Sequence, residues 1–177
     1  MNLDYAALYE PLHRMSGGKF FGGKVRGLEV VVDLVSRTAP RSMLDYGSGK
    51  GKQYTVRRQH LAWGGLEPVC YDVGVPALAK RPTGTFDGII AADIMEHIHP
   101  TDVDEVLGDL FGFSSHRDPP AESFVYFHIC CVPSVHKRLE DGRDVHLTIE
   151  PPEFWNEKLN GFRRDGLIIE ARFEGAC

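Results

Sequence analysis

A short glycine-rich stretch, residues 42–51, constrains the fold more than any other part of the chain. It reads Ser-Met-Leu-Asp-Tyr-Gly-Ser-Gly-Lys-Gly. Its apolar start predicts a short buried strand, and residues 52–63 can continue as a helix. Glycine permits positive φ and close approach of the backbone, so such a turn can bring bare backbone N–H groups to a ligand. The sequence therefore predicts an α/β fold with a ligand beside this turn.

The spacing of the glycines separates two classes of cofactor. A dinucleotide-binding turn, G-x-G-x-x-G, would place a glycine where this chain has Lys52. The chain instead has Asp45, Gly47, Gly49 and Gly51 at alternate positions. This pattern resembles motif I of the class I S-adenosylmethionine (SAM) dependent methyltransferases. A nicotinamide-dependent oxidoreductase is the less favoured alternative, because of Lys52 and because about forty residues precede the turn.

Two downstream segments agree with this resemblance. Residues 68–72 predict a second strand that ends in Asp72. In a doubly wound sheet this carboxylate would face the same crevice as the glycine turn, where it can accept both ribose hydroxyls of an adenosine. Residues 86–93 predict another buried strand, followed by Ile94-Met-Glu-His-Ile. That run resembles motif IV of small-molecule methyltransferases.

The resemblance covers about residues 40–130 and implies a SAM site assembled from three strand ends. By that resemblance, the glycine turn surrounds the methionine end of SAM and Asp72 holds the ribose. Asp93 and Ile94 would lie beside the amino end and the sulfonium, and the product would be S-adenosylhomocysteine (SAH). The implied cofactor-binding residues are Asp45, Tyr46, Gly47, Ser48, Gly49, Asp72, Asp93 and Ile94.

Two histidines are the candidate catalytic residues. Methyl transfer from a sulfonium depends on alignment and desolvation, and needs a base only where the acceptor must lose a proton. His97 and His146 are the best placed, since histidine titrates near neutral pH. For each, the competing interpretation is a structural histidine bonded to a backbone carbonyl. His128 lies inside the predicted strand 123–130 and is expected in the core.

A divalent-metal-assisted O-methyltransferase is an alternative. Asp93, Glu96, His97 and His146 resemble the metal site of the plant small-RNA 2′-O-methyltransferases. Two carboxylates and two imidazoles could hold an ion that orients a hydroxyl and lowers its pKa. The metal stays an alternative, because a Glu-His step also occurs in enzymes that need no metal. The asparagine-containing turn of the RNA enzymes is absent at residues 130–134, which disfavours an RNA substrate.

The predicted architecture is a single domain, residues 1–177, with a Rossmann-like three-layer sandwich and a mostly parallel sheet. Residues 73–85 are too few for a helix and a strand, so the third strand of the family is expected to be missing or vestigial. Only one strand, 167–173, is evident near the end, so the usual last strand is lost, short or formed elsewhere. Helices are expected at residues 3–15 with an interruption near Pro11, 25–37, 52–63, 101–112 with Thr101 as N-cap, and 151–159. The glycine-rich segment 16–24 is expected to be either an ordinary loop or a mobile lid.

Composition limits the partners. A net charge of −5 without a basic block argues against nucleic acid, and no apolar run reaches transmembrane length. Four cysteines without a C-x-x-C pair predict reduced thiols in a cytoplasmic protein. The expected acceptor is a small molecule or a sugar, methylated at oxygen or nitrogen. A homodimer through a sheet edge is left open, and the alternative to an enzyme is a non-catalytic module that binds SAM or a partner. The residues expected around the acceptor are Phe20, Phe21, His136 and Trp155.

Overall fold

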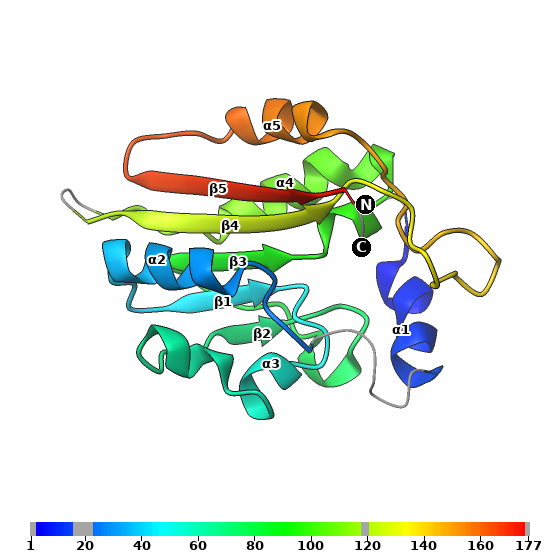
Figure 1. Ribbon diagram of the computed structural model, residues 1–177, viewed down its shortest axis with the longest axis horizontal. Helices are drawn as coiled ribbons and strands as arrows, with labels where there is room; N and C mark the ends of the chain where they lie inside the picture. The colour runs from blue at the N-terminus through cyan, green and yellow to red at the C-terminus, as the bar shows by residue number, and fades with distance from the viewer. Residues whose placement is uncertain (1–2, 16–22, 118–120, 176–177) are drawn as a thin grey trace.

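The computed structural model describes residues 3–15, 23–117 and 121–175 and contains one open five-stranded sheet (Figure 1). All strand pairs are parallel, and the strand order is β2-β1-β3-β4-β5. The strands are β1 (Met43–Tyr46), β2 (Val69–Tyr71), β3 (Gly88–Ala92), β4 (Ser123–Cys130) and β5 (Leu167–Glu174). The α-helices are α1 (Tyr5–Met15), α2 (Leu28–Thr38), α3 (Lys52–Thr55), α4 (Val103–Gly112) and α5 (Pro152–Asn160).

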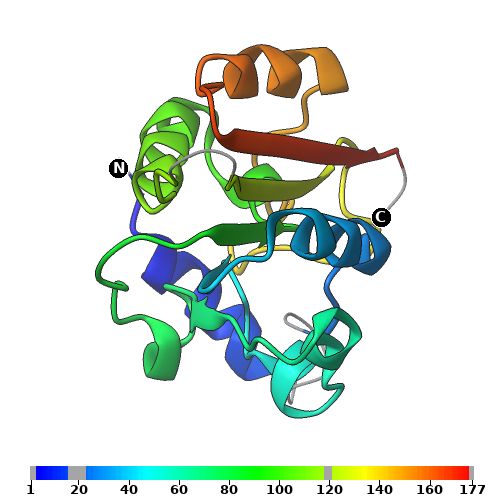
Figure 2. The ribbon, with the colours of Figure 1, turned by 90° about the vertical axis from the view of Figure 1, so that its left-hand side faces the viewer.

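Helices cover both faces of the sheet, as the end-on view of Figure 2 shows. On one face, α2 buries Val31 and Leu34 in a cluster that includes Phe124 of β4. On the other face, α4 and α5 bury Leu107 and Trp155 in a larger cluster. Burial of these apolar side chains on two faces is the main stabilising contribution. The described chain is therefore a Rossmann-like three-layer α/β sandwich, which confirms the predicted fold class.

The sheet is shortened where the sequence predicted. Residues 72–87 are all described, and they contain a 3₁₀ turn (Pro76–Leu78) but no strand between β2 and β3. At the other end, β5 pairs in parallel with β4 over its whole length, from Ser123–Leu167 to Cys130–Glu174. Within the described residues no further strand follows β5. The loss of the third strand is confirmed, and the sheet has no antiparallel pair among these five strands.

Three helix predictions are wrong in detail. The expected helix 52–63 is two pieces: α3 ends at Thr55, Arg58 adopts positive φ (51°), and a 3₁₀ helix follows from Gln59 to Trp63. The expected interruption near Pro11 is absent, because α1 continues through it. Proline removes one backbone hydrogen bond, and the hydroxyls of Tyr5 and Tyr9 anchor the helix to the rest of the fold. Thr101 does not cap α4: a 3₁₀ turn precedes the helix, and the backbone N–H of Thr101 donates to the ring of His99.

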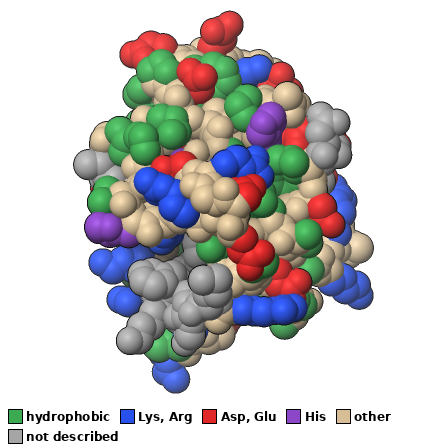
Figure 3. Space-filling view, turned by 90° about the vertical axis from the view of Figure 1, so that its right-hand side faces the viewer, with side chains coloured by type: hydrophobic (Ala, Val, Ile, Leu, Met, Phe, Trp, Pro, Cys, Tyr) green, Lys and Arg blue, Asp and Glu red, His purple; other side chains and the backbone are tan. Residues whose placement is uncertain are grey.

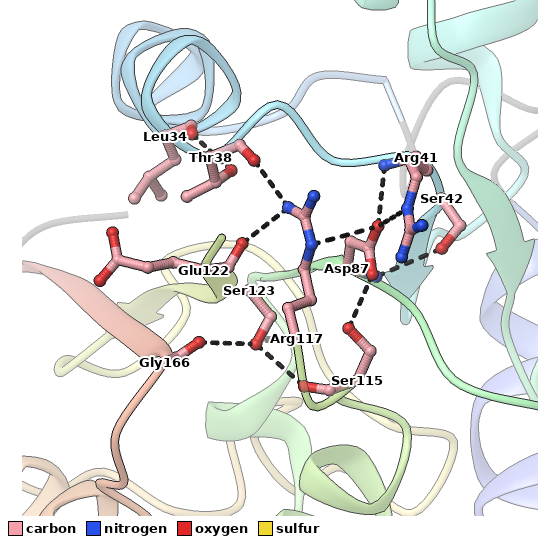
Figure 4. A network of polar contacts seen from close by, with 10 residues as sticks. All are labelled: Leu34, Thr38, Arg41, Ser42, Asp87, Ser115, Arg117, Glu122, Ser123 and Gly166. Atoms are coloured by element: carbon pink, nitrogen blue, oxygen red, sulfur yellow. Dashed lines mark hydrogen bonds and ion pairs between the residues drawn. The ribbon is translucent and has the colours of Figure 1, made fainter. Parts of the chain in front are cut away.

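A buried carboxylate, that of Asp87, is the centre of a polar network at the amino ends of the strands (Figure 4). Asp87, just before β3, accepts hydrogen bonds from the backbone N–H of Arg41 (2.9 Å) and the hydroxyl of Ser115 (2.7 Å). The guanidinium of Arg117 lies 3.8 Å from the same carboxylate and donates to the carbonyl of Thr38 at the end of α2 (2.7 Å). This network joins α2, β3 and the segment after α4. The polar side chains of this network are hydrogen-bonded to one another and to the backbone.

No described helix has the length and apolar character needed to span a lipid bilayer.

Cys70 and Cys131 are free thiols, as expected. The prediction of a reduced thiol is wrong for Cys130, which is disulfide-bonded. The predicted lid segment 16–24 lies outside the described residues except for its last two positions.

Candidate functional site

A pocket of about 740 Å³ opens at the carboxyl ends of the strands. This volume lies within the range of about 300–1,000 Å³ that is typical of small-molecule sites. Figure 3 views this side of the molecule, where Lys and Arg side chains lie among Asp, Glu and His side chains. The structure brings every predicted cofactor and catalytic residue to this pocket: Asp45, Tyr46, Gly47, Ser48, Gly49, Asp72, Asp93, Ile94, His97 and His146.

The glycine turn differs from the prediction in its hydrogen bonds. The backbone N–H groups of Gly47 and Ser48 donate to the carbonyl of Tyr71 (2.8 and 3.1 Å), and that of Gly49 donates to Asp72 (2.7 Å). The expectation of bare N–H groups is therefore wrong for these three residues, because the turn folds back onto the end of β2. Glycine is required at position 47 for another reason: φ is +80°, and a Cβ there would lie 2.7 Å from the side chain of Ile94.

The side chains of Asp45 and Tyr46 serve the fold. Asp45 is 4% exposed and accepts hydrogen bonds from Gln53 and from the hydroxyl of Tyr54, both at 2.7 Å. Burial raises the pKa of Asp45 to about 6, although the two hydrogen bonds oppose this shift. The hydroxyl of Tyr46 donates to Asp109 on α4 (3.0 Å). These two side chains hold the turn against the helices on both faces.

Asp72 lines the pocket directly after the end of β2. Its two oxygens accept the backbone N–H groups of Gly49 (2.7 Å) and Gly74 (2.9 Å). The Nε2 atom of His13, from α1, lies 3.8 Å from one of them. Burial raises the pKa of Asp72, while the nearby imidazole opposes the shift. The carboxylate predicted to bind ribose is thus held in a fixed orientation by two backbone donors.

Asp93 forms a separate ionic group. It adopts positive φ (56°), and its carboxylate accepts a hydrogen bond from Nδ1 of His128 (2.6 Å) and lies 3.4 Å from Nε of Arg26. Burial favours the neutral acid, but His128 and Arg26 outweigh it, so the pKa of Asp93 is lowered. His128 is buried as expected, yet it is no apolar core residue, because its Nε2 also lies 3.5 Å from Glu174. It sits at the carboxyl end of β4, where polar groups from neighbouring strands meet.

Glu96, His97 and His146 form a compact buried cluster. One ligand-type atom from each lies within 4.8 Å of the others. Nδ1 of His97 is bonded to the carbonyl of Val145 (2.8 Å), and Nδ1 of His146 to that of Val132 (2.7 Å). Each bond places the proton on Nδ1 and the lone pair on Nε2. Asp93, the fourth residue of the predicted metal set, is not part of the cluster, because it is bonded to His128 instead.

The electrostatics of this cluster are unusual. Glu96 is 1% exposed; its Oε1 accepts the N–H of Cys130 (3.3 Å), while Oε2 is buried without a hydrogen-bond partner. Burial, and then the charge of Asp93, raise the pKa of Glu96 well above its usual value. Burial and the neighbouring His146 lower the pKa of His97 to about 4. A buried acceptor without a partner costs free energy, which is expected where a ligand completes the site.

The sequence did not lead us to expect that α1 lines the pocket. Tyr5, Tyr9 and His13 line the pocket, and their spacing of four residues places them on one face of a helix. That spacing was visible in the sequence and could have identified this face. His136 lines the pocket as predicted, whereas Trp155, a residue of α5, is fully buried in the core and does not line it. The predicted acceptor residues Phe20 and Phe21 lie outside the described residues.

Comparison with models of protein families finds no match, and neither do comparisons with curated proteins and with solved structures.

Proposed function

We propose that this protein is a SAM-dependent methyltransferase that acts on an oxygen or nitrogen of a small molecule or sugar. The supporting observation is that residues from three strand ends, which match the methyltransferase pattern in order and spacing, border one pocket of about 740 Å³. This is the crevice where doubly wound sheets bind their ligands. A non-catalytic module that binds SAM or a partner remains the alternative.

Asp72 is the residue that we assign to the ribose. Each of its oxygens accepts one backbone N–H, from Gly49 or Gly74. A carboxylate oxygen has a second lone pair, so both oxygens can also accept a ribose hydroxyl without losing the backbone bonds. This arrangement fixes the carboxylate before the ligand arrives, which lowers the entropic cost of binding.

Calorimetric titration with SAM and SAH tests the shared premise of both alternatives. We expect saturable binding to the wild type, and a 10- to 100-fold weaker affinity for Asp72→Asn, on the scale of a charged hydrogen bond. Asp33→Asn is the matched control, because Asp33 is an exposed carboxylate on α2. No heat of binding at millimolar SAH, or equal affinities of the two variants, would contradict the assignment.

Turnover separates the enzyme from the binding module. Wild-type protein is incubated with SAM and the small-molecule fraction of a cell extract, and SAH is measured by mass spectrometry. An enzyme releases SAH in proportion to time and protein concentration. A binding module retains SAM unchanged, and boiled protein sets the background of spontaneous decay.

A metal-assisted reaction is the second candidate, and the Glu96–His97–His146 cluster supports it. Bonds from Nδ1 to backbone carbonyls fit a structural histidine, but they are also how proteins orient metal-binding imidazoles. The unpartnered buried Oε2 of Glu96 favours the second interpretation. A pKa of about 4 also makes His97 a weak base at neutral pH, which favours a ligand role over general-base catalysis.

The donor set suits a first-row transition metal such as Zn²⁺, Mn²⁺, Fe²⁺ or Co²⁺, because two imidazoles and one carboxylate are ligands that these ions accept. Such an ion would supply Lewis acidity toward an acceptor hydroxyl. Glu96, His97 and His146 would hold it, and the carbonyls of Val145 and Val132 would keep the two rings oriented. Asp93 is excluded from this set and stays with His128.

Cobalt absorption spectroscopy tests the site without an acceptor. We expect Co²⁺ to produce d–d bands with the wild type, and at least 10-fold weaker binding with Glu96→Gln. Glu157→Gln on the exposed side of α5 is the control. Equal Co²⁺ affinity of the two variants, or no bands with the wild type, would exclude this candidate and leave the metal-free reaction.

A further inference from the structure

We propose that Tyr9 of α1 is a positioning residue for the imidazole pair His97 and His146. The inference concerns residues of the site under "Proposed function", and rests on that function only in treating the pair as a working part of the site. It assigns a role in the site to the N-terminal helix, which the sequence predicted only as a structural preface.

The hydroxyl of Tyr9 joins the two segments that carry the imidazoles. It lies 2.8 Å from the carbonyl oxygen of His97 and 2.9 Å from that of Val145, so its single hydrogen is shared between them. The carbonyl of Val145 also accepts the Nδ1 proton of His97 (2.8 Å). A closed ring of contacts therefore fixes the His97 backbone, the His97 ring and the residue before His146.

The segment that carries His146 is held by individual hydrogen bonds rather than by a helix or a strand. Residues 131–151 are described throughout and contain no helix or named strand. Three other hydrogen bonds attach this segment to residues 96–98. The backbone N–H groups of Leu147 and Thr148 donate to the carbonyl of Glu96 (2.7 and 3.1 Å), and the hydroxyl of Thr148 donates to the carbonyl of Ile98 (2.6 Å). These bonds hold the backbone beyond His146, whereas Tyr9 acts on the side where the two imidazoles face each other, 5.0 Å apart between ring centroids.

The hydroxyl can be removed without releasing α1. The ring of Tyr9 packs edge-on against His97 at 5.4 Å, a contact that phenylalanine keeps. Elsewhere on α1, the hydroxyl of Tyr5 donates to Asp102 (2.8 Å), and Lys50 donates to the carbonyl of His13 (2.6 Å). Tyr9→Phe therefore tests the hydroxyl alone.

Tyr5→Phe is the matched control. It deletes the same atom from the same face of the same helix, but Tyr5 contacts Asp102 and the N–H of His99 rather than the carbonyls that hold the imidazole pair. Any general loosening of α1 would appear in both variants, whereas a positioning role would appear only with Tyr9→Phe.

Two measurements are made on the full-length wild type and both variants. Long-range ¹H–¹⁵N NMR at a single neutral pH reports which ring nitrogen of each histidine carries the proton. Co²⁺ titration followed by d–d absorption reports the affinity of the imidazole pair with Glu96. We expect Tyr9→Phe to convert the Nδ1–H form of His97 into a mixture of tautomers and to weaken Co²⁺ binding about 10-fold, with both properties unchanged in Tyr5→Phe.

The proposal is overturned if the His97 tautomer in Tyr9→Phe equals that of the wild type, or if Tyr5→Phe changes it equally. Absence of Co²⁺ binding to the wild type would defeat the metal candidate alone, since the tautomer measurement still decides the role of Tyr9. Circular dichroism of each variant confirms that α1 and the sheet are retained.

Discussion

At the scale of single residues, Gly47 shows that a motif glycine can be required by the chain itself. Its φ of +80° disfavours any side chain, and a Cβ would lie 2.7 Å from Ile94. The sequence led us to assign this glycine to close approach by a ligand. In the structure, its nearest constraint is the residue after Asp93, so the turn and the end of β3 are packed against each other.

Gly47→Ala is expected to lower stability and to abolish SAH binding. Positive φ costs a non-glycine residue about 1–3 kcal/mol, and Ile94 must also move. Gly64→Ala separates the two effects, because Gly64 has φ +92° but open space around it. Urea unfolding should show a smaller loss for Gly64→Ala, and calorimetry should show unchanged SAH affinity. Normal SAH binding by Gly47→Ala would contradict this account of the turn.

Asp45 is expected to make stability depend on pH. Its pKa is about 6 in the folded protein and near 3.8 in an unfolded chain. A raised folded pKa stabilises the protein below the unfolded pKa, and this contribution is lost as pH rises through 6. The shift corresponds to about 3 kcal/mol. The difference in unfolding free energy between wild type and Asp45→Asn, measured in urea at intervals from pH 4 to 7, should fall by most of that amount. A difference that does not vary with pH would exclude the shift.

At the scale of elements, the two ends of β3 differ: a polar network holds the amino end, and pocket residues follow the carboxyl end. The amino end is held by Asp87, which bonds Arg41 and Ser115 and lies beside Arg117. The carboxyl end leads into Asp93 and the short 3₁₀ helix Met95–His97 (η3), which carries two residues of the cluster. The network at the amino end therefore helps to fix the strand whose other end carries pocket residues.

Asp87→Ala is expected to cost about 3 kcal/mol of unfolding free energy, because it removes the carboxylate that accepts from the buried hydroxyl of Ser115 and lies beside the guanidinium of Arg117. Asp33→Ala removes a carboxylate whose ion pair with Arg37 is more than half exposed, so it should cost less than about 1 kcal/mol. Urea unfolding of both variants gives the comparison. Equal losses would show that the network of Figure 4 contributes no more than a surface pair.

At the scale of the whole molecule, the sequence predicted the positions of the five strands well, because each is a short apolar run ended by polar or glycine residues. It predicted less of the site, for physical reasons. Arg58 adopts a left-handed conformation that no local pattern signals, and it lies between α3 and the 3₁₀ helix that follows. The bonds from the turn to Tyr71 and Asp72 depend on tertiary packing. His146 lies about fifty residues from His97, and the sequence grouped the two only through the family resemblance. The fold brings His146 to Glu96 and His97, and leaves Asp93 out of the cluster.

Ligand binding is expected to stabilise the whole fold, since the pocket draws on three strand ends and α1. A ligand at 100 times its Kd adds about 2.7 kcal/mol to the unfolding free energy. SAH at that concentration should therefore raise the melting temperature of the wild type, and raise that of Asp72→Asn much less at the same concentration. Differential scanning fluorimetry gives both values. No shift for the wild type would count against the pocket as an SAH site.

The structure of the protein bound to SAH is the most direct test of the proposed function. The account predicts that the ribose hydroxyls bond to Asp72, that the methionine end lies along the turn of Gly47–Gly49, and that the sulfur faces the space beside Glu96, His97 and His146. SAH bound at another face of the molecule, or bound in this pocket with its ribose away from Asp72, would contradict it.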